Sequence, residues 1–222
     1  MVDKNIYDIV FIIDSTNSMR SYIDTVTEKC RNIIDEINSS FSKEKQFKFG
    51  AILYRDIVDN KKCENVIIKL TPDKGLIKSN LEKVETQWGG DDAEDWNSAY
   101  LLLVDEMNWT CDKSVKIAVH IADASTHGKE FTAKRETDNH PDEGVNFMQT
   151  IKKVAEKGIR IIGFPINNIP IHCFQKFMEI YKQNNGYSFS NYINVLPKHD
   201  DFDAEIFDQI IKETLKFLIS HE

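Results

Sequence analysis

The chain has 222 residues, of which 41% are hydrophobic and 29% are charged, and its formal net charge is −8. This length holds one large domain or two small ones. Because no stretch rich in proline, glycine or serine divides the sequence, we expect a single domain over residues 1–222. The acidic balance argues against nonspecific nucleic-acid binding, which needs basic patches that neutralise phosphates.

The cysteines and the apolar segments indicate the cellular compartment of the protein. The four cysteines are widely scattered and show no zinc-ligand spacing: Cys30, Cys63, Cys111 and Cys173. The N-terminus lacks a signal-peptide core, and no apolar stretch approaches the roughly 20 residues needed to cross a bilayer. We therefore expect a cytoplasmic protein with reduced thiols.

The first half of the chain begins with an unbroken apolar run at residues 9–13. Such a run is typical of a strand buried on both faces of a parallel sheet. Apolar residues then recur at helical spacing over 19–41. Residues 47–54 predict a second strand, and residues 66–70 predict a third, near enough to the second to form an antiparallel edge hairpin.

The second half alternates helical and strand patterns. Helices are predicted from Pro72, over about 94–107, from Pro141 to a C-cap at Gly158, over 171–181 and over 204–219, and strands over 115–122, 159–164 and 187–189. This order predicts an α/β fold with a doubly wound, mostly parallel sheet, one antiparallel edge strand and helices on both faces.

Polar side chains follow the first strand directly. Asp14, Thr16 and Ser18 lie where open α/β sheets place their ligand sites, at the carboxyl end of a strand. One carboxylate and two hydroxyls suit a hard divalent cation such as Mg²⁺. Asp and Ser also cap helices often, so capping of the next helix is an equally good interpretation of this fragment alone.

Two further loops carry acidic residues. Asp91 follows Gly89 and Gly90, which let the backbone approach a ligand closely, and Asp123 follows the strand at 115–122. An acidic helix start would explain Asp92, Glu94 and Asp95, and an Asx turn would explain Asp123. The predicted sheet brings all three loops to one rim, and this coincidence favours a metal site.

These motifs together resemble von Willebrand factor A domains. The segment 14–18 (DSTNS) is similar to their DxSxS signature, and the likeness covers nearly the whole chain. It is nearest to the A domains attached to alpha-type protein kinases of the myosin heavy-chain kinase class. The matching segments are 54–56 (YRD), 90–95 (GDDAED) and 120–130 (HIADASTHGKE).

The resemblance implies a metal-ion-dependent adhesion site that recognises another protein. Thr16 and Ser18 would ligate Mg²⁺ or Mn²⁺ through their hydroxyls, and Asp14 and Asp123 would hold the ion directly or through water. Asp91 would take the place of a threonine in the second loop, and its charge would make the ion less electrophilic toward an acidic partner. A partner carboxylate or carbonyl would replace a bound water. The sequence indicates neither the partner, nor the oligomeric state, nor whether a kinase domain belongs to the protein.

The alternative is an Mg²⁺-dependent phosphoryl-transfer enzyme with Asp14 as nucleophile. Haloacid-dehalogenase-like phosphatases have a DxD motif after the first strand, and Thr16 stands here at the second acidic position. That replacement removes the usual acid/base, so we expect no enzymatic activity. His127 resembles a catalytic residue in isolation, but no nucleophile elbow such as GxSxG accompanies it. We expect His127 to order its loop beside the metal.

Three further expectations concern aromatic and ionic residues. His120 is expected to be a satisfied core histidine, because it lies within a buried strand. Trp88 and Trp96 are expected to pack in the core. Arg55 and Asp56 would pair with each other, pair with the metal-site loops, or form a plain surface ion pair.

Overall fold

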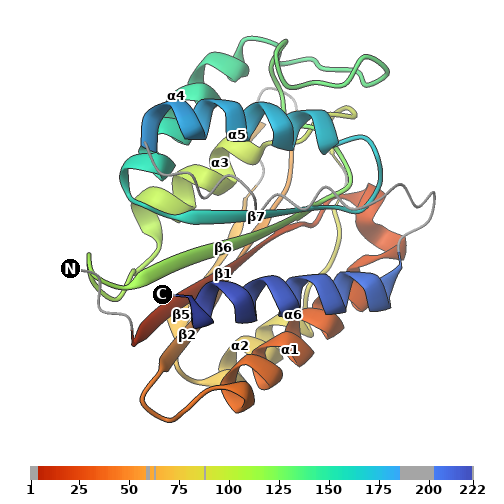
Figure 1. Cartoon of the computed structure of the whole chain (residues 1–222). Helices are drawn as coiled ribbons and strands as arrows, with labels where there is room; N and C mark the ends of the chain where they lie inside the picture. Colours follow the sequence, from red (N-terminus) through yellow and green to blue (C-terminus); the bar gives the residue numbers. More distant parts are fainter. Residues whose placement is uncertain (1–4, 59–60, 63, 88, 186–202, 222) are drawn as a thin grey trace.

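A computed structural model describes residues 5–58, 61–62, 64–87, 89–185 and 203–221 of the chain (Figure 1). Its centre is a five-stranded sheet in the order β5-β2-β1-β6-β7. The strands are β1 (Ile6–Asp14), β2 (Gln46–Tyr54), β5 (Val66–Thr71), β6 (Val115–Ala122) and β7 (Arg160–Pro165). Only the edge strand β5 runs antiparallel to its neighbour. The predicted fold class is therefore confirmed.

Two layers of helices cover the sheet (Figure 1). One face carries α1 (Ile23–Ser40), α2 (Lys74–Leu81) and α6 (Ala204–Ser220), and the other carries α3 (Trp96–Leu101), α4 (Glu143–Glu156) and α5 (Ile171–Asn185). Short elements complete the order: a 3₁₀ turn η1 (Asn17–Ser21), strands β3 (Ile57–Val58) and β4 (Lys61–Lys62), and a π-helical turn η2 (Leu102–Glu106). Segments on both sides of the sheet are thus packed onto it, as in a doubly wound fold.

The central strand β1 is covered on both faces, which explains why apolar residues in this run do not alternate with polar ones. Successive side chains of a strand point to opposite faces. Ile9, Phe11 and Ile13 join the cluster under α1 and α6, whereas Val10 and Ile12 join the cluster under α3 and α4. All five residues are completely buried. The pattern requires apolar residues at every position because both faces of β1 are covered.

Several element boundaries differ from the sequence prediction in informative ways. The helix expected at 94–107 ends as an α-helix at Leu101 and continues as η2. The β2–β5 connection holds the small β3–β4 ladder in addition to the hairpin. Gly158 has a positive φ of 65°, as expected of a C-cap glycine. The strand predicted at 187–189 and Trp88 lie outside the described residues.

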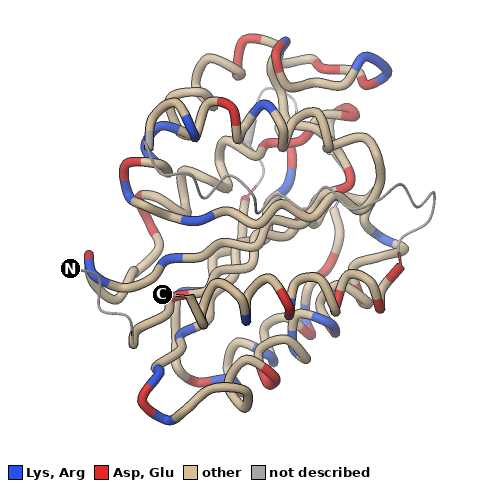
Figure 2. Tube along the Cα trace, in the orientation of Figure 1, with Lys and Arg blue, Asp and Glu red and all other residues tan. Residues whose placement is uncertain are grey.

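Charged positions are distributed over both layers. Figure 2 shows Lys and Arg interspersed with Asp and Glu along the helices and loops. Some of them form surface ion pairs, such as Lys78 with Asp35 at 2.6 Å. Among the described residues, no helix combines the length and the apolar character needed to cross a membrane.

Candidate metal-binding site

The first loop is folded by Asp14 itself. Oδ1 of Asp14 accepts hydrogen bonds from the backbone N–H of Thr16 at 2.9 Å and from the Thr16 hydroxyl at 2.7 Å, which closes an Asx turn. Thr16 is the N-cap of η1 and makes no side-chain capping bond, and α1 begins after Tyr22 without one. The helix-capping interpretation of Asp14 and Ser18 therefore does not hold.

Four of the five predicted ligands form one connected set. The hydroxyls of Thr16 and Ser18 lie 3.1 Å apart, and the Ser18 hydroxyl donates to Oδ1 of Asp123 at 3.0 Å. Asp14 joins the set through Thr16. An octahedral Mg²⁺ shell with bonds near 2.05 Å has neighbouring oxygens about 2.9 Å apart. Hard oxygen donors at this spacing fit a divalent cation.

Asp14 is held from its other side by a buried chain of hydrogen bonds. The Tyr54 hydroxyl donates to Oδ2 of Asp14 at 3.1 Å and lies 3.2 Å from Nε2 of His120, whose Nδ1 lies 2.9 Å from the Tyr100 hydroxyl. Burial lowers the pKa of His120 to about 3, so the ring is neutral. Its Nε2–H therefore donates to Tyr54, and its Nδ1 accepts from Tyr100. The expectation of a satisfied core histidine is confirmed.

The carboxylates at this rim are crowded. Burial, followed by the charge of Asp123, raises the pKa of Asp14 to about 7. Burial raises the pKa of Asp123 to about 6. Both side chains are nearly inaccessible to solvent, so a cation would relieve their repulsion more effectively than water does.

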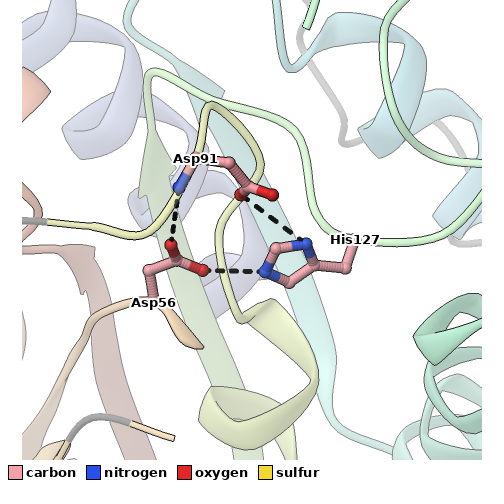
Figure 3. Close-up of side chains that lie close together, drawn as sticks. All are labelled: Asp56, Asp91 and His127. Atoms are coloured by element: carbon pink, nitrogen blue, oxygen red, sulfur yellow. Dashed lines mark hydrogen bonds and ion pairs between the residues drawn. The ribbon is translucent and has the colours of Figure 1, made fainter. Parts of the chain in front are cut away.

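Asp91 belongs to a neighbouring cluster with Asp56 and His127 (Figure 3). Oδ2 of Asp91 accepts the backbone N–H of Asn139, and Oδ1 lies 4.0 Å from Nδ1 of His127. Burial raises the pKa of Asp91. Asp91 also lines a pocket of about 980 Å³ together with Ser18 and Asp123. The structure thus places Asp91 beside the rim, with its Oδ2 bonded to the backbone of Asn139 and its buried Oδ1 without a hydrogen-bond partner among the described residues.

The ligand atoms of Asp56, Asp91 and His127 lie within 4.8 Å of one another, which is close enough for a metal ion. However, Nε2 of His127 lies 2.7 Å from Oδ1 of Asp56, and Nδ1 lies 3.0 Å from Oδ1 of Asp138. A ring with a carboxylate at each nitrogen is satisfied only when both nitrogens carry protons. Burial alone would lower the pKa of His127, but the bonds to Asp56 and Asp138 outweigh it and raise that pKa. The imidazolium is therefore the cation that this cluster already contains.

The contact of this loop with Asp56 explains why two glycines precede Asp91. Its Oδ2 accepts the backbone N–H groups of Gly90 and Asp91. A Cβ atom at Gly90 would collide with the carbonyl oxygen of Ile57, so only glycine fits there. The glycines let the loop approach Asp56, and of the alternatives for Asp56 the structure shows contact with the second and third acidic loops. Arg55 instead donates to the carbonyl oxygen of Glu64 at 2.7 Å.

Sequence reasoning assigned Glu94 no more than a helix-start role. The structure gives the helix-start role to Asp95, whose Oδ1 accepts the backbone N–H of Ser98 at 3.0 Å and caps α3. Glu94 is 3% exposed and lines the same pocket as Ser18 and Asp123. Only its position one residue before the cap distinguishes it in the sequence. Trp96 is fully buried, as expected.

Comparisons with known proteins identify a fold and no family. No family model and no curated protein sequence matches the chain. Two crystal structures of the pilus adhesin SpaC from Lactobacillus rhamnosus GG are similar, each with a TM-score of 0.62 and 12% identity; they cover 98% and 97% of this chain and 30% and 31% of the adhesin. Proximal thread matrix protein 1 from the mussel byssus has a TM-score of 0.51 and 15% identity, over 83% of this chain and 47% of that protein. The chain spans less than half of each, and at these identities the likeness shows the fold alone.

Proposed function

We propose that this chain is a von Willebrand factor A-type domain that binds another protein through a divalent cation, Mg²⁺ or Mn²⁺. The observation that carries the proposal is the spacing of the Thr16, Ser18 and Asp123 oxygens, which matches neighbouring positions of an octahedral shell. Asp14 would complete the protein ligands, and Asp91 would contribute through water from the adjacent cluster. The cation would supply a position at which a partner carboxylate or carbonyl replaces a water molecule.

The fold and the named neighbours support a binding role. The similar structures are a pilus adhesin and a matrix protein of the mussel byssus, and the first is by its name a binding protein. The motifs shared with alpha-kinase-associated A domains further suggest a targeting module of such a protein. This part of the proposal rests on the sequence motifs.

The geometry at Asp14 does not favour the phosphoryl-transfer alternative. Oδ1 of Asp14 accepts two bonds from Thr16, and Oδ2 accepts one from Tyr54. Such phosphatases place a second carboxylate, the acid/base, two residues after the nucleophile, whereas Thr16 stands there in this chain and its hydroxyl donates to Asp14. We therefore propose a domain without phosphatase activity, which an assay with p-nitrophenyl phosphate and Mg²⁺ tests directly.

Calorimetric titration with Mg²⁺ and Mn²⁺ tests the proposed site. We expect binding to be lost in Asp14→Ala and reduced about tenfold or more in Ser18→Ala, because each change removes an oxygen donor. Circular dichroism should show that the metal-free domain stays folded, since its two apolar clusters do not involve the cation. Unchanged affinity in both variants would place the metal elsewhere or nowhere.

A further inference from the structure

We infer that the pocket beside the candidate cation site takes a short segment of the protein partner that carries an apolar side chain next to a carboxylate. The carboxylate would pair with Lys134 and Arg135, and the apolar side chain would pack on Ile169. The inference names the chemistry of the partner, deepens the proposed function and rests on its protein-binding role. The pocket has a volume of about 980 Å³ and extends from Ser18 and Asp123 to these three residues.

Hydrogen bonds tie together the segments that enclose the pocket. The pocket lies between residues 89–94 of the second loop, residues 132–136 after β6, and residues 167–172 at the start of α5. The Asn167 side chain donates to the carbonyl oxygen of Asp123 at 2.8 Å, and Nε2 of His172 lies 3.2 Å from the carbonyl oxygen of Glu130. The walls are therefore in place before a partner arrives, which lowers the ordering cost of binding.

Lys134 and Arg135 are exposed cations that line the pocket. The loop after β6 projects from the body of the molecule, and Figure 2 shows basic residues at its tip. Within the part of the chain that the structure describes, neither side chain forms a hydrogen bond or an ion pair. The carboxylate of Glu136 next to them is engaged elsewhere, because it accepts the backbone N–H groups of Ser125 and Ala133, each at 3.0 Å. Two cations without a partner inside the chain offer the charge that a carboxylate of another protein complements.

Ile169 supplies an apolar part of the pocket wall. It is 42% exposed and lines the pocket together with Ala124 and Ala133. Its backbone N–H donates to Oδ1 of Asn167 at 2.7 Å, which fixes the turn on which it stands. A single exposed apolar residue is ordinary on a protein surface, whereas apolar side chains gathered in a pocket with charged walls are typical of a binding site.

The second loop gives the partner segment a direction. Asp92 is the exposed acidic side chain of that part of the wall, and its Oδ2 accepts the backbone N–H and the hydroxyl of Thr137, each at 2.8 Å. Its negative charge repels a carboxylate, so the acidic group of the partner is favoured beside Lys134 and Arg135. The loop after β6, and not the cation, would therefore distinguish an acidic partner from a basic one.

Selection of phage-displayed peptides of random sequence on the immobilised domain in Mg²⁺ is the first test. We expect the selected peptides to carry Asp or Glu beside a large apolar residue. A variant with both Lys134→Glu and Arg135→Glu should lose the preference for acidic residues. Selected peptides rich in Lys or Arg, the same acidic preference in the variant, or no enrichment at all would overturn the inference.

The affinity of one selected peptide, labelled with fluorescein and followed by fluorescence anisotropy, is the second test. Lys134→Gln combined with Arg135→Gln should weaken binding about fivefold or more and remove most of its dependence on salt. Lys129→Gln is the control, because Lys129 is an exposed cation of the same loop outside the pocket. Ile169→Ser should also weaken binding about fivefold. Its control is Val145→Ser, on an exposed apolar residue of α4 outside the pocket. Losses as large in the controls would contradict the inference.

The same experiments separate the inference from the proposed cation site. If calorimetry shows Mg²⁺ binding but the selected peptides lack the acidic and apolar residues, the cation site stands and the inference falls. If the peptide binds Asp14→Ala in EDTA as tightly as it binds the wild type in Mg²⁺, and the changes at Lys134 and Arg135 weaken it, the inference stands and the role of the cation in partner binding falls. If no peptide is enriched with or without Mg²⁺, both fall.

Discussion

Nε2 of His127 lies 2.7 Å from Oδ1 of Asp56, and the two side chains are 2% and 0% exposed. Asp56 follows β2, whereas His127 lies in the loop after β6, so the pair connects two loops that are separated by the central strand. Asp138 holds the other ring nitrogen and also accepts the backbone N–H of Gly128. The imidazolium thereby fixes the loops around the candidate cation site without belonging to it.

His127→Gln should destabilise the domain. The change removes a buried positive charge and leaves the carboxylates of Asp56 and Asp138 without it, which costs about 3 to 5 kcal/mol when a buried pair loses one partner. Urea unfolding followed by circular dichroism measures the loss. His172→Gln is the control, because His172 is exposed and lines the pocket beside the candidate cation site. A His127 variant as stable as the His172 variant would show that the pair contributes little.

Tyr54→Phe should weaken cation binding about tenfold, the smaller end of the range for groups that orient a metal ligand. The hydroxyl that it removes donates to Oδ2 of Asp14. Tyr100→Phe removes an equally buried hydroxyl from the other end of the same hydrogen-bonded chain, where it bonds to His120. Calorimetry should show near wild-type affinity for Tyr100→Phe. Equal losses of affinity in the two variants would mean that these hydrogen-bonded side chains affect cation binding only through their packing.

The stability of the metal-free domain should decrease as the pH rises. Asp14 and Asp123 have pKa values of about 7 and about 6 in the folded chain, against an ordinary value of 3.8. The folded state therefore binds more protons, so this contribution is complete below about pH 4 and is lost as the pH passes through 6 to 7. In EDTA, the melting temperature should fall between about pH 5 and about pH 8, and Mg²⁺ should reduce the fall. The fall should be shallower in Asp14→Asn, and an identical slope in the two proteins would contradict the assignment.

Asp91→Asn should reduce cation affinity only a few-fold. In the proposed site Asp91 acts through water, and an outer-sphere charge contributes less than a direct ligand. The asparagine carbonyl can still accept the N–H of Asn139. Calorimetry beside Asp14→Ala distinguishes the roles: a loss in Asp91→Asn as complete as in Asp14→Ala would make Asp91 a direct ligand, and no loss would remove it from the site.

Much of the fold followed from local patterns. The run at Ile9–Ile13 predicts a central strand because every position is apolar, and it is the central strand of the sheet. Gly158 predicts the end of α4, because its positive φ suits a residue without a Cβ atom. The end of α3 at Leu101 was not predictable in this way, because the apolar spacing continues through the π-helical turn that follows.

The site was predictable only where one short segment forms it. Asp14, Thr16 and Ser18 are joined by hydrogen bonds within five residues of sequence, so the local motif itself determines their arrangement. The positions of Asp91 and Glu94 depend on the path of the second loop, which is fixed by hydrogen bonds from Gly90 and Asp91 to Asp56, 34 and 35 residues earlier in the chain. No local pattern encodes such a contact.

The backbone bridges around the rim have a kinetic consequence. Thr16 pairs with Gln87, and Glu94 pairs with Thr126, so main-chain bonds join the three loops whether or not an ion is present. An ion would therefore enter a preformed cage, and little ordering entropy would oppose its capture. The rate of loading should then follow the ion's own release of water, which is slow for Mg²⁺. Mn²⁺ should therefore bind to the same oxygens at a higher rate than Mg²⁺.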